Sequence, residues 1–192
     1  MEQKVVLVFF GSPRLDGFTA KLLKAFLKPF PEKGCRVEFV DTYREKLEPC
    51  IACGLCKTRE ACRFRDMDDI DRLLRSADLL VFATPVYNLT FPAPLKAVID
   101  RFQRYFEARF SLGIRPPISK QRPSVLLATL GSKDLTGVEV LSRQLKTAFT
   151  VMNTSLESSV VWSDTDHAGE KEESAALKRA EAAALAIIGE LW

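Results

Sequence analysis

A polar glycine turn between two apolar segments constrains this chain more than any other feature of its sequence. The turn, GSPRLDGFT, occupies residues 11–19 and separates the apolar run 4–10 from the helix-like run 20–30. A strand, a glycine turn and a helix in this order direct backbone N–H groups and a helix N-terminus toward one point, where an anion is favoured. The turn is therefore a candidate phosphate site.

The turn matches neither of the two common nucleotide-binding loops. It lacks the Lys-Ser/Thr pair of a Walker loop, and its two glycines, Gly11 and Gly17, do not follow the G-x-G-x-x-G spacing. Its side chains offer hydroxyls at Ser12 and Thr19 and a guanidinium at Arg14, which suit a phosphomonoester such as the end of FMN. An ordinary strand-to-helix connection capped by Thr19 is the alternative, because Gly, Ser, Pro and Asp are also common turn residues.

The composition indicates a soluble globular protein. The chain has 192 residues, of which 47% are hydrophobic and 28% charged, and we expect a single domain over residues 1–192. No apolar run approaches the roughly 20 residues of a membrane span, and the short apolar start does not suit a signal peptide, so we expect a cytoplasmic protein without a membrane partner. The net charge of +3 is small and scattered, which argues against nucleic-acid binding.

Strand-like and helix-like stretches alternate along the chain, which predicts a parallel sheet with helices on both faces. Strands are expected at residues 4–10, 36–41, 79–84, 123–129 and 156–162. Helices are expected at 20–30, at 68–75 with a cap from the acids around Asp66, from 94 onward with Phe106 on the buried side, at 138–152 and at 172–192. The segment 109–121 is expected to be an exposed excursion.

Five strands joined in this way predict an α/β fold of the flavodoxin-like kind. We expect a doubly wound parallel sheet in the order 2-1-3-4-5 within three α/β/α layers. In such sheets a ligand contacts the loops at the carboxyl ends of the strands, which here begin at Gly11, Pro85 and Gly131.

Four of the five cysteines lie together in a polar loop at residues 48–66. They are Cys50, Cys53, Cys56 and Cys62, spaced C-x2-C-x2-C-x5-C. The chain can bend so that the first three thiolates surround one compact centre, and the fourth can complete the ligands of a [4Fe–4S] cluster. A zinc site, redox-active thiols and a structural role are the alternatives, of which zinc usually has its cysteine pairs farther apart in sequence.

Three other residue types have ordinary interpretations. Cys35 is expected to be a small buried hydrophobe, and His167, the only histidine, a solvated loop residue. Trp162 and Trp192 are expected to anchor the core or a subunit contact.

Three segments together carry a family resemblance. GSPRLDGFT, CIACGLCKTREAC and TPVYNLTFPAPLKAVIDRF, in this order and separation, resemble the NADPH-dependent FMN reductase family. Within that family, the cysteine run is similar to that of the iron–sulfur flavoproteins. The resemblance extends from the first strand to about Thr129. It implies FMN as cofactor, NAD(P)H as electron donor, and a homodimer or homotetramer in which the cysteine loop lies near the flavin ring.

The resemblance also assigns residues to the flavin. The positions that match those holding the FMN phosphate and ribityl chain are Ser12, Arg14, Phe18 and Thr19. The loop along the isoalloxazine ring is matched by Pro85, Val86, Tyr87 and Asn88, and a third flavin-facing loop by Gly131 and Ser132. Phe18 replaces a usual Asn, and Asn88 a common aromatic residue, so we expect looser flavin binding than is typical. Arg101 also resembles a family position, with a structural ion pair as the alternative.

The predicted function is an FMN-dependent NAD(P)H oxidoreductase. Electrons would pass from a reduced donor through FMN to a quinone, a flavin or a protein acceptor, with the cluster dividing a two-electron transfer into single-electron steps. Three alternatives stay open: a flavodoxin-like electron carrier without enzymatic activity, an FMN reductase without a cluster, and a zinc-stabilised binding module with a vestigial flavin site.

Overall fold

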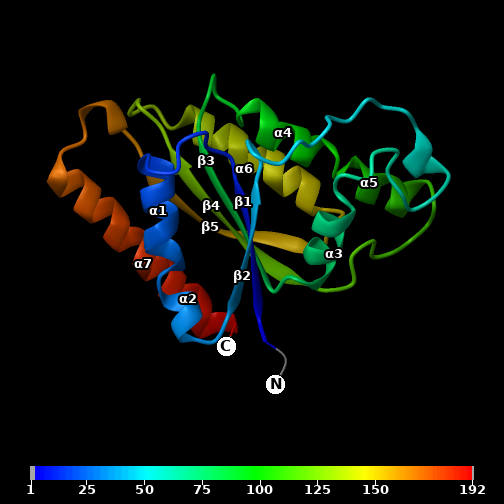
Figure 1. Ribbon diagram of the computed structural model, residues 1–192, viewed down its shortest axis with the longest axis horizontal. Helices are drawn as coiled ribbons and strands as arrows, with labels where there is room; N and C mark the ends of the chain where they lie inside the picture. Colours follow the sequence, from blue (N-terminus) through cyan, green and yellow to red (C-terminus); the bar gives the residue numbers. More distant parts are fainter. Residues whose placement is uncertain (1–2, 192) are drawn as a thin grey trace.

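A five-stranded parallel sheet forms the centre of the computed structural model, which describes residues 3–191 (Figure 1). The strands, in spatial order, are β2 (Arg36–Asp41), β1 (Val5–Phe10), β3 (Leu79–Pro85), β4 (Arg122–Thr129) and β5 (Thr154–Trp162). The predicted order 2-1-3-4-5 is confirmed. The strand that follows β1 in the chain, β2, lies on one side of the β1–β3 pair, and the strand that follows β3, β4, lies on the other. The loops after β1 and β3 therefore flank the switch point of the sheet.

Helices cover both faces of the sheet, as Figure 1 shows. One face is covered by α1 (Phe18–Leu27), α2 (Pro29–Glu32) and α7 (Glu170–Leu191). The other face is covered by α3 (Asp68–Ser76), α4 (Ala93–Asp100), α5 (Gln103–Phe110) and α6 (Thr136–Phe149). Two short 3₁₀ turns, η1 (Leu55–Lys57) and η2 (Thr165–His167), lie in connecting loops.

The sequence of β1 shows why the sheet is buried on both faces. All six residues, VVLVFF, are buried. Because side chains alternate across a strand, Val6 and Val8 pack toward α1 and α7, whereas Leu7 and Phe9 pack toward α3, α4 and α6. Phe9 stacks on Phe82 of β3 with ring centroids 4.9 Å apart. Each fully buried side chain of this kind contributes about 1.5–3 kcal/mol, so the two apolar layers fix the orientation of the strand ends.

Two predicted helices are each divided in the structure. The helix expected at 20–30 ends at Leu27, and α2 begins at Pro29, because proline has no N–H to continue a helix but suits a first helical position. The helix expected from residue 94 is broken at Arg101, where α4 ends and the chain turns before α5. This break leaves Phe106 exposed, so the prediction that it faces the core was wrong.

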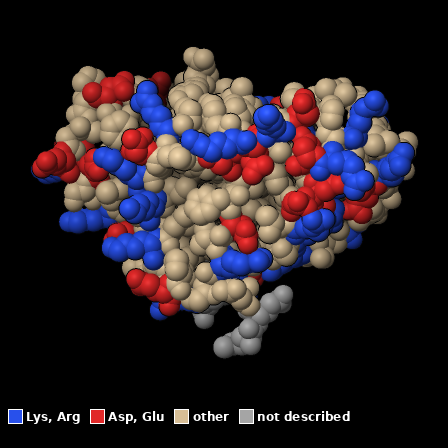
Figure 2. Space-filling model, in the orientation of Figure 1, with Lys and Arg blue, Asp and Glu red and all other residues tan. Residues whose placement is uncertain are grey.

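The expected cap of α3 was also wrong. The helix begins after Met67 without a side-chain cap, and Asp66 instead accepts hydrogen bonds from the Glu48 amide and from Arg101. Cys35 and Trp162 are buried as predicted, and Trp192 lies outside the described residues. None of the described helices is long and apolar enough to cross a bilayer. Lys, Arg, Asp and Glu are interspersed over the face seen in Figure 2.

Candidate functional site

The loop after β1 is held close to β3 and α4. The Gly11 amide donates a 2.8 Å hydrogen bond to the Ala83 carbonyl. A Cβ at Gly11 would lie 2.6 Å from Cδ2 of Leu95, so glycine is required for this close approach. Ser12 is buried, and its hydroxyl accepts a 3.3 Å hydrogen bond from the Arg14 amide, which tightens the turn.

The N-terminus of α1 is open toward this loop. Its N-cap, Gly17, provides no side-chain hydrogen bond. Thr19 does not cap the helix, as one interpretation of the sequence proposed, because its Oγ1 lies 2.6 Å from Oγ1 of Thr129 on β4. The first amides of an α-helix have no intrahelical acceptor, so this end of α1 offers N–H donors and the positive end of the helix dipole.

Phe18 contributes to this end mainly through its backbone. Its ring meets the Trp162 ring edge-on, with centroids 4.9 Å apart, and Lys21 Nζ lies 5.9 Å from the Phe18 ring centroid. The apolar ring of Phe18 offers no hydrogen-bond donor at this end of the helix, whereas the backbone amides there do.

The loop after β3 forms a tight two-residue turn. Tyr87 and Thr90 exchange two backbone hydrogen bonds of 3.0 and 2.9 Å, and the two residues between them have φ angles of 49° and 61°. Asn tolerates this left-handed conformation, which gives a local reason for Asn88 at the tip. Val86 anchors the loop to the end of β4 through its amide and the Thr129 carbonyl, 2.8 Å away. Tyr87 is left 45% exposed beside the switch point.

The loop after β4 is paired with the loop after β5. The Thr165 amide donates to the Leu130 carbonyl at 3.1 Å, and the Asp164 amide donates to the Ser132 carbonyl at 3.0 Å. A Cβ at Gly131 would lie 2.3 Å from the carboxylate of Asp166. This carboxylate therefore lies directly over the Gly131 backbone.

These loops enclose one cavity of about 240 Å³, which we call the strand-end pocket. Its lining includes Ser12, Arg14, Phe18, Thr19, Pro85, Val86, Tyr87 and Gly131 from the predicted set. Asn88 and Ser132 lie outside this lining. Asn88 is at the tip of the loop after β3, and the Ser132 carbonyl accepts a hydrogen bond from the loop after β5.

The sequence analysis missed other lining residues: Gly17, Thr129, Leu130, Thr165 and Asp166. The rule that ligands meet the carboxyl ends of strands could have included Thr129, the last residue of β4. Nothing in the sequence indicated that η2, after an edge strand, folds back over Gly131.

The cysteine loop (residues 48–66) lies beside α5 in Figure 1. It encloses a second cavity of about 240 Å³, which we call the cysteine hollow. All four predicted ligands, Cys50, Cys53, Cys56 and Cys62, line it. Left-handed backbone at Ala52 and Gly54, with φ of 52° and 75°, turns the chain between these cysteines. Among residues 3–191, no three Cys, His, Asp or Glu side chains form a group that could hold a metal ion.

Basic side chains from the break between α4 and α5 and from α5 itself complete the hollow. Arg101 and Arg104 line it together with Glu107. Burial raises the pKa of the Cys56 thiol; a backbone hydrogen bond opposes this rise, and the negative charges of Glu107, Cys50 and Cys53 add to it.

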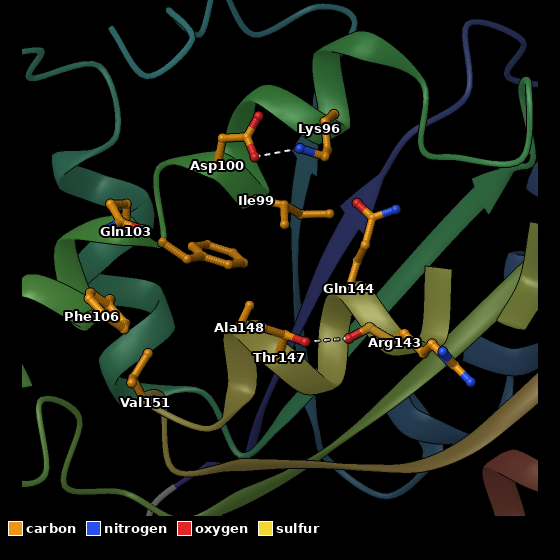
Figure 3. Close-up of a pocket in the computed structure, with 11 residues that line it drawn as sticks. Lys96, Ile99, Asp100, Gln103, Phe106, Arg143, Gln144, Thr147, Ala148 and Val151 are labelled. Carbon is orange, nitrogen blue, oxygen red and sulfur yellow. Dashed lines mark hydrogen bonds and ion pairs between the residues drawn. The ribbon is translucent and has the colours of Figure 1, made fainter. Parts of the chain in front are cut away.

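A third cavity, of about 390 Å³, lies among α4, α5 and α6 (Figure 3). Figure 3 shows Lys96 and Asp100 paired along α4 at one side of the cavity and Phe106 on the α5 side. Nζ of Lys96 lies 2.5 Å from Oδ1 of Asp100. Its lining comes from the helices and from the residues next to them, not from the loops at the carboxyl ends of the strands. We therefore assign the candidate cofactor site to the strand-end pocket.

A sequence model of NADPH-dependent FMN reductases matches residues 5–168. The chain belongs to this family. The match covers all five strands and the cysteine loop, so the family resemblance inferred from the three segments is confirmed.

Curated proteins with the name iron–sulfur flavoprotein are similar to the chain. One from Archaeoglobus fulgidus is 40% identical over 50% of this chain and 44% of its own length. One from Methanosarcina thermophila is 39% identical over 47% and 48%, and one from Methanocaldococcus jannaschii is 30% identical over 73% and 68%. The chain spans about half the length of the first two of these relatives.

Solved structures show the same fold at lower identity. An NAD(P)H:quinone oxidoreductase from Methanothermobacter marburgensis matches 95% of both chains with a TM-score of 0.70 and 20% identity. An azoreductase from Bacillus anthracis matches 95% of this chain and 99% of its own, with a TM-score of 0.68 and 22% identity.

Proposed function

We propose that this protein is an FMN-dependent NAD(P)H oxidoreductase that passes electrons through an iron–sulfur centre to a quinone, a flavin or a protein acceptor. The observation that carries the proposal is the strand-end pocket, because it combines an open helix N-terminus, Arg14 and the paired hydroxyls of Thr19 and Thr129 at the switch point of the sheet. These groups suit a phosphate at one end of a ligand.

The remaining loops suit the rest of the FMN molecule. Tyr87 presents an exposed aromatic ring beside the pocket, and the Gly131 backbone borders it. Bound FMN accepts a hydride and releases electrons singly or in pairs. The task of the chain is to hold the phosphate, orient the ring and keep one ring face open to the donor. A further structure with this fold, that of an FMN-dependent NADH-azoreductase from Bacillus anthracis, was solved in complex with FMN.

The cysteine hollow fits an iron–sulfur centre by its donor chemistry. Four sulfur atoms line one cavity, and buried Nε atoms of Arg101 and Arg104, two residues of the same lining, have no hydrogen-bond partner among the described residues. A thiolate-ligated cluster is anionic, so unused cationic donors at the cavity wall suit it.

The spacing of the thiols supports a cluster over zinc. Zinc requires all four sulfurs at about 2.3 Å from one ion, whereas the ligands of a [4Fe–4S] cluster bind different irons and stand farther apart. Among the described residues, no three Cys, His, Asp or Glu side chains form a group that could hold a metal ion. The same observation keeps an FMN reductase without a cluster as the second candidate.

We also propose a homodimer or homotetramer. The strand-end pocket and the cysteine hollow share no lining residue within one chain. A second copy that brings its cysteine loop to this pocket would shorten the path for electrons. Sedimentation of the FMN-loaded protein tests this assembly, and a monomer at all concentrations would contradict it.

The function is tested on protein purified without oxygen. We expect flavin absorption bands above a broad iron–sulfur shoulder, about four irons and four sulfides per chain, and steady oxidation of NADPH or NADH with a quinone as acceptor. Cys56→Ser should abolish iron incorporation and retain FMN. The matched control is Cys35→Ser, which changes a buried cysteine outside the loop and should retain both.

Each other outcome has a defined meaning. Flavin without iron or sulfide would establish the reductase without a cluster. Reduction by a partner protein but not by a nicotinamide would establish an electron carrier. Zinc in place of iron, with no flavin after reconstitution, would overturn the proposal.

A further inference from the structure

Arg101 connects the cysteine loop to the rest of the fold. It lies at the break between α4 and α5, and its side chain is only 2% exposed. Its guanidinium donates to the Glu48 carbonyl at 3.2 Å, to the Phe64 carbonyl at 2.9 Å and to the Asp66 carboxylate. These three acceptors come from the two ends of the loop.

The two ends also meet each other directly. The amide of Glu48 donates a 2.7 Å hydrogen bond to Oδ2 of Asp66, while Oδ1 of the same carboxylate accepts from Arg101. A planar guanidinium offers five N–H donors in a fixed arrangement, so it can hold several acceptors at defined angles. A lysine ammonium at this position would act as a single point donor.

A fourth donor of this guanidinium is directed at a sulfur. Nη2 of Arg101 lies 3.4 Å from Sγ of Cys62, the cysteine farthest along the loop. Nε of Arg101 is buried without a partner in the described structure, and it belongs to a residue that lines the cysteine hollow. The guanidinium therefore lies at the edge of the hollow, and its Nε–H donor forms no hydrogen bond with the loop.

We infer that Arg101 is the positioning residue of the cysteine loop, and that its N–H donor at Cys62 raises the reduction potential of the cluster bound there. The part about the potential rests on the iron–sulfur function proposed above. Hydrogen bonds and positive charge next to a ligating sulfur stabilise the reduced, more negative form of a cluster. Burial strengthens this effect because little water screens the charge.

Three variants test the inference. Arg101→Lys keeps the positive charge and loses the planar group of donors. Arg101→Gln with Asp66→Asn removes both charges together, so that no unpaired carboxylate is left at the end of the loop. The control is Arg109→Gln on α5, where the arginine donates to the Thr150 carbonyl and does not line the cysteine hollow.

The first readout is amide hydrogen exchange over residues 48–66 in the metal-free protein. We expect exchange about tenfold faster or more in the double variant, a smaller increase in Arg101→Lys, and none in Arg109→Gln. This measurement needs neither iron nor activity. Unchanged exchange in the double variant would overturn the positioning role.

The second readout is the midpoint potential of the iron–sulfur signal in anaerobically loaded protein, with FMN content measured on the same sample. We expect a lower potential in the double variant, with FMN retained, and an unchanged potential in the control. An unchanged potential at full iron content would overturn the role in tuning. Wild-type protein that binds no iron would refute the proposed cluster and with it the tuning role, whereas hydrogen exchange would still decide the positioning role.

Discussion

The hydroxyl oxygens of Thr19 and Thr129 lie 2.6 Å apart and join the first turn of α1 to the last residue of β4. Both residues are buried and both line the strand-end pocket. Each hydroxyl has one proton, so when one donates to the other, only the second can donate to a ligand. The pair therefore has a single proton left to donate into the pocket, and its position is fixed by two separate elements of the fold.

Replacing either hydroxyl tests this arrangement. Thr19→Val and Thr129→Val should each weaken FMN binding about tenfold and affect riboflavin binding much less, because only FMN has the phosphate. The double variant should lose more than either single variant, because each single variant keeps one hydroxyl whose proton is free to donate to the ligand. Titration of apoprotein by flavin fluorescence measures the affinity of each variant for the two ligands. Thr147→Val on the exposed face of α6 is the control, and equal losses for FMN and riboflavin would contradict the assignment.

Arg14 is expected to act through charge at an exposed position of the same loop. Arg14→Ala should weaken FMN binding about tenfold at low salt and less at high salt, because ions screen an exposed charge. Arg14→Lys should recover part of the loss, since it keeps the charge without the paired donors. Isothermal titration at two salt concentrations measures this, and a loss independent of salt would show that Arg14 does not face the phosphate.

Gly137 permits close contact between α6 and the loop after β3. A Cβ there would lie 2.5 Å from Cγ1 of Val86 and 3.3 Å from the Leu89 backbone. Gly137→Ala should therefore destabilise the protein by about 1–3 kcal/mol and weaken FMN binding by displacing this loop. Gly189→Ala is the matched control, because a Cβ in that part of α7 meets open space and should stabilise the helix by up to about 1 kcal/mol. Urea unfolding measures whether each substitution raises or lowers the free energy of unfolding. Stabilisation by Gly137→Ala would contradict the packing argument.

Asp78 is expected to make stability depend on acid pH. Burial alone would raise the pKa of its carboxyl group, but hydrogen bonds from Lys120, the Val5 amide and Lys4 outweigh it and leave the pKa lowered. A carboxyl group with a lowered native pKa contributes stability above its unfolded pKa of about 3.9, and this contribution is lost as the pH falls through the native pKa. Asp78→Asn should be less stable than wild type by about 1 kcal/mol near neutral pH, and the two should converge in acid. Urea unfolding across this range measures the difference, and a gap that persists in acid would contradict the mechanism.

The sheet and its ligand-binding edge were predictable from local sequence patterns. Apolar strands such as β1 alternate with amphipathic helices, and this alternation together with the switch-point rule led to the observed strand order and to the loops at Gly11, Pro85 and Gly131. The pattern of cysteine spacing likewise predicted one shared cavity, and the four thiols line one.

Tertiary contacts explain what local patterns could not predict. Asp66 has the sequence position of a helix cap, yet the buried guanidinium of Arg101 is a stronger partner for it. Phe106 follows the apolar period of α4, but the chain turns at Arg101 and ends that period. Asp166 enters the strand-end pocket because η2 pairs with the loop after β4, a contact between segments more than 30 residues apart.

The direct contact between Glu48 and Asp66 closes the cysteine loop as an insert between β2 and α3. The chain leaves the flavodoxin-like body and returns to it at one place, but Arg75 and Arg101 of the body pair with Glu60 and Asp66 of the loop. A shorter or exchanged loop would therefore leave two arginines of the helical layer without these carboxylate partners, so the loop and the helices beside it have to change together.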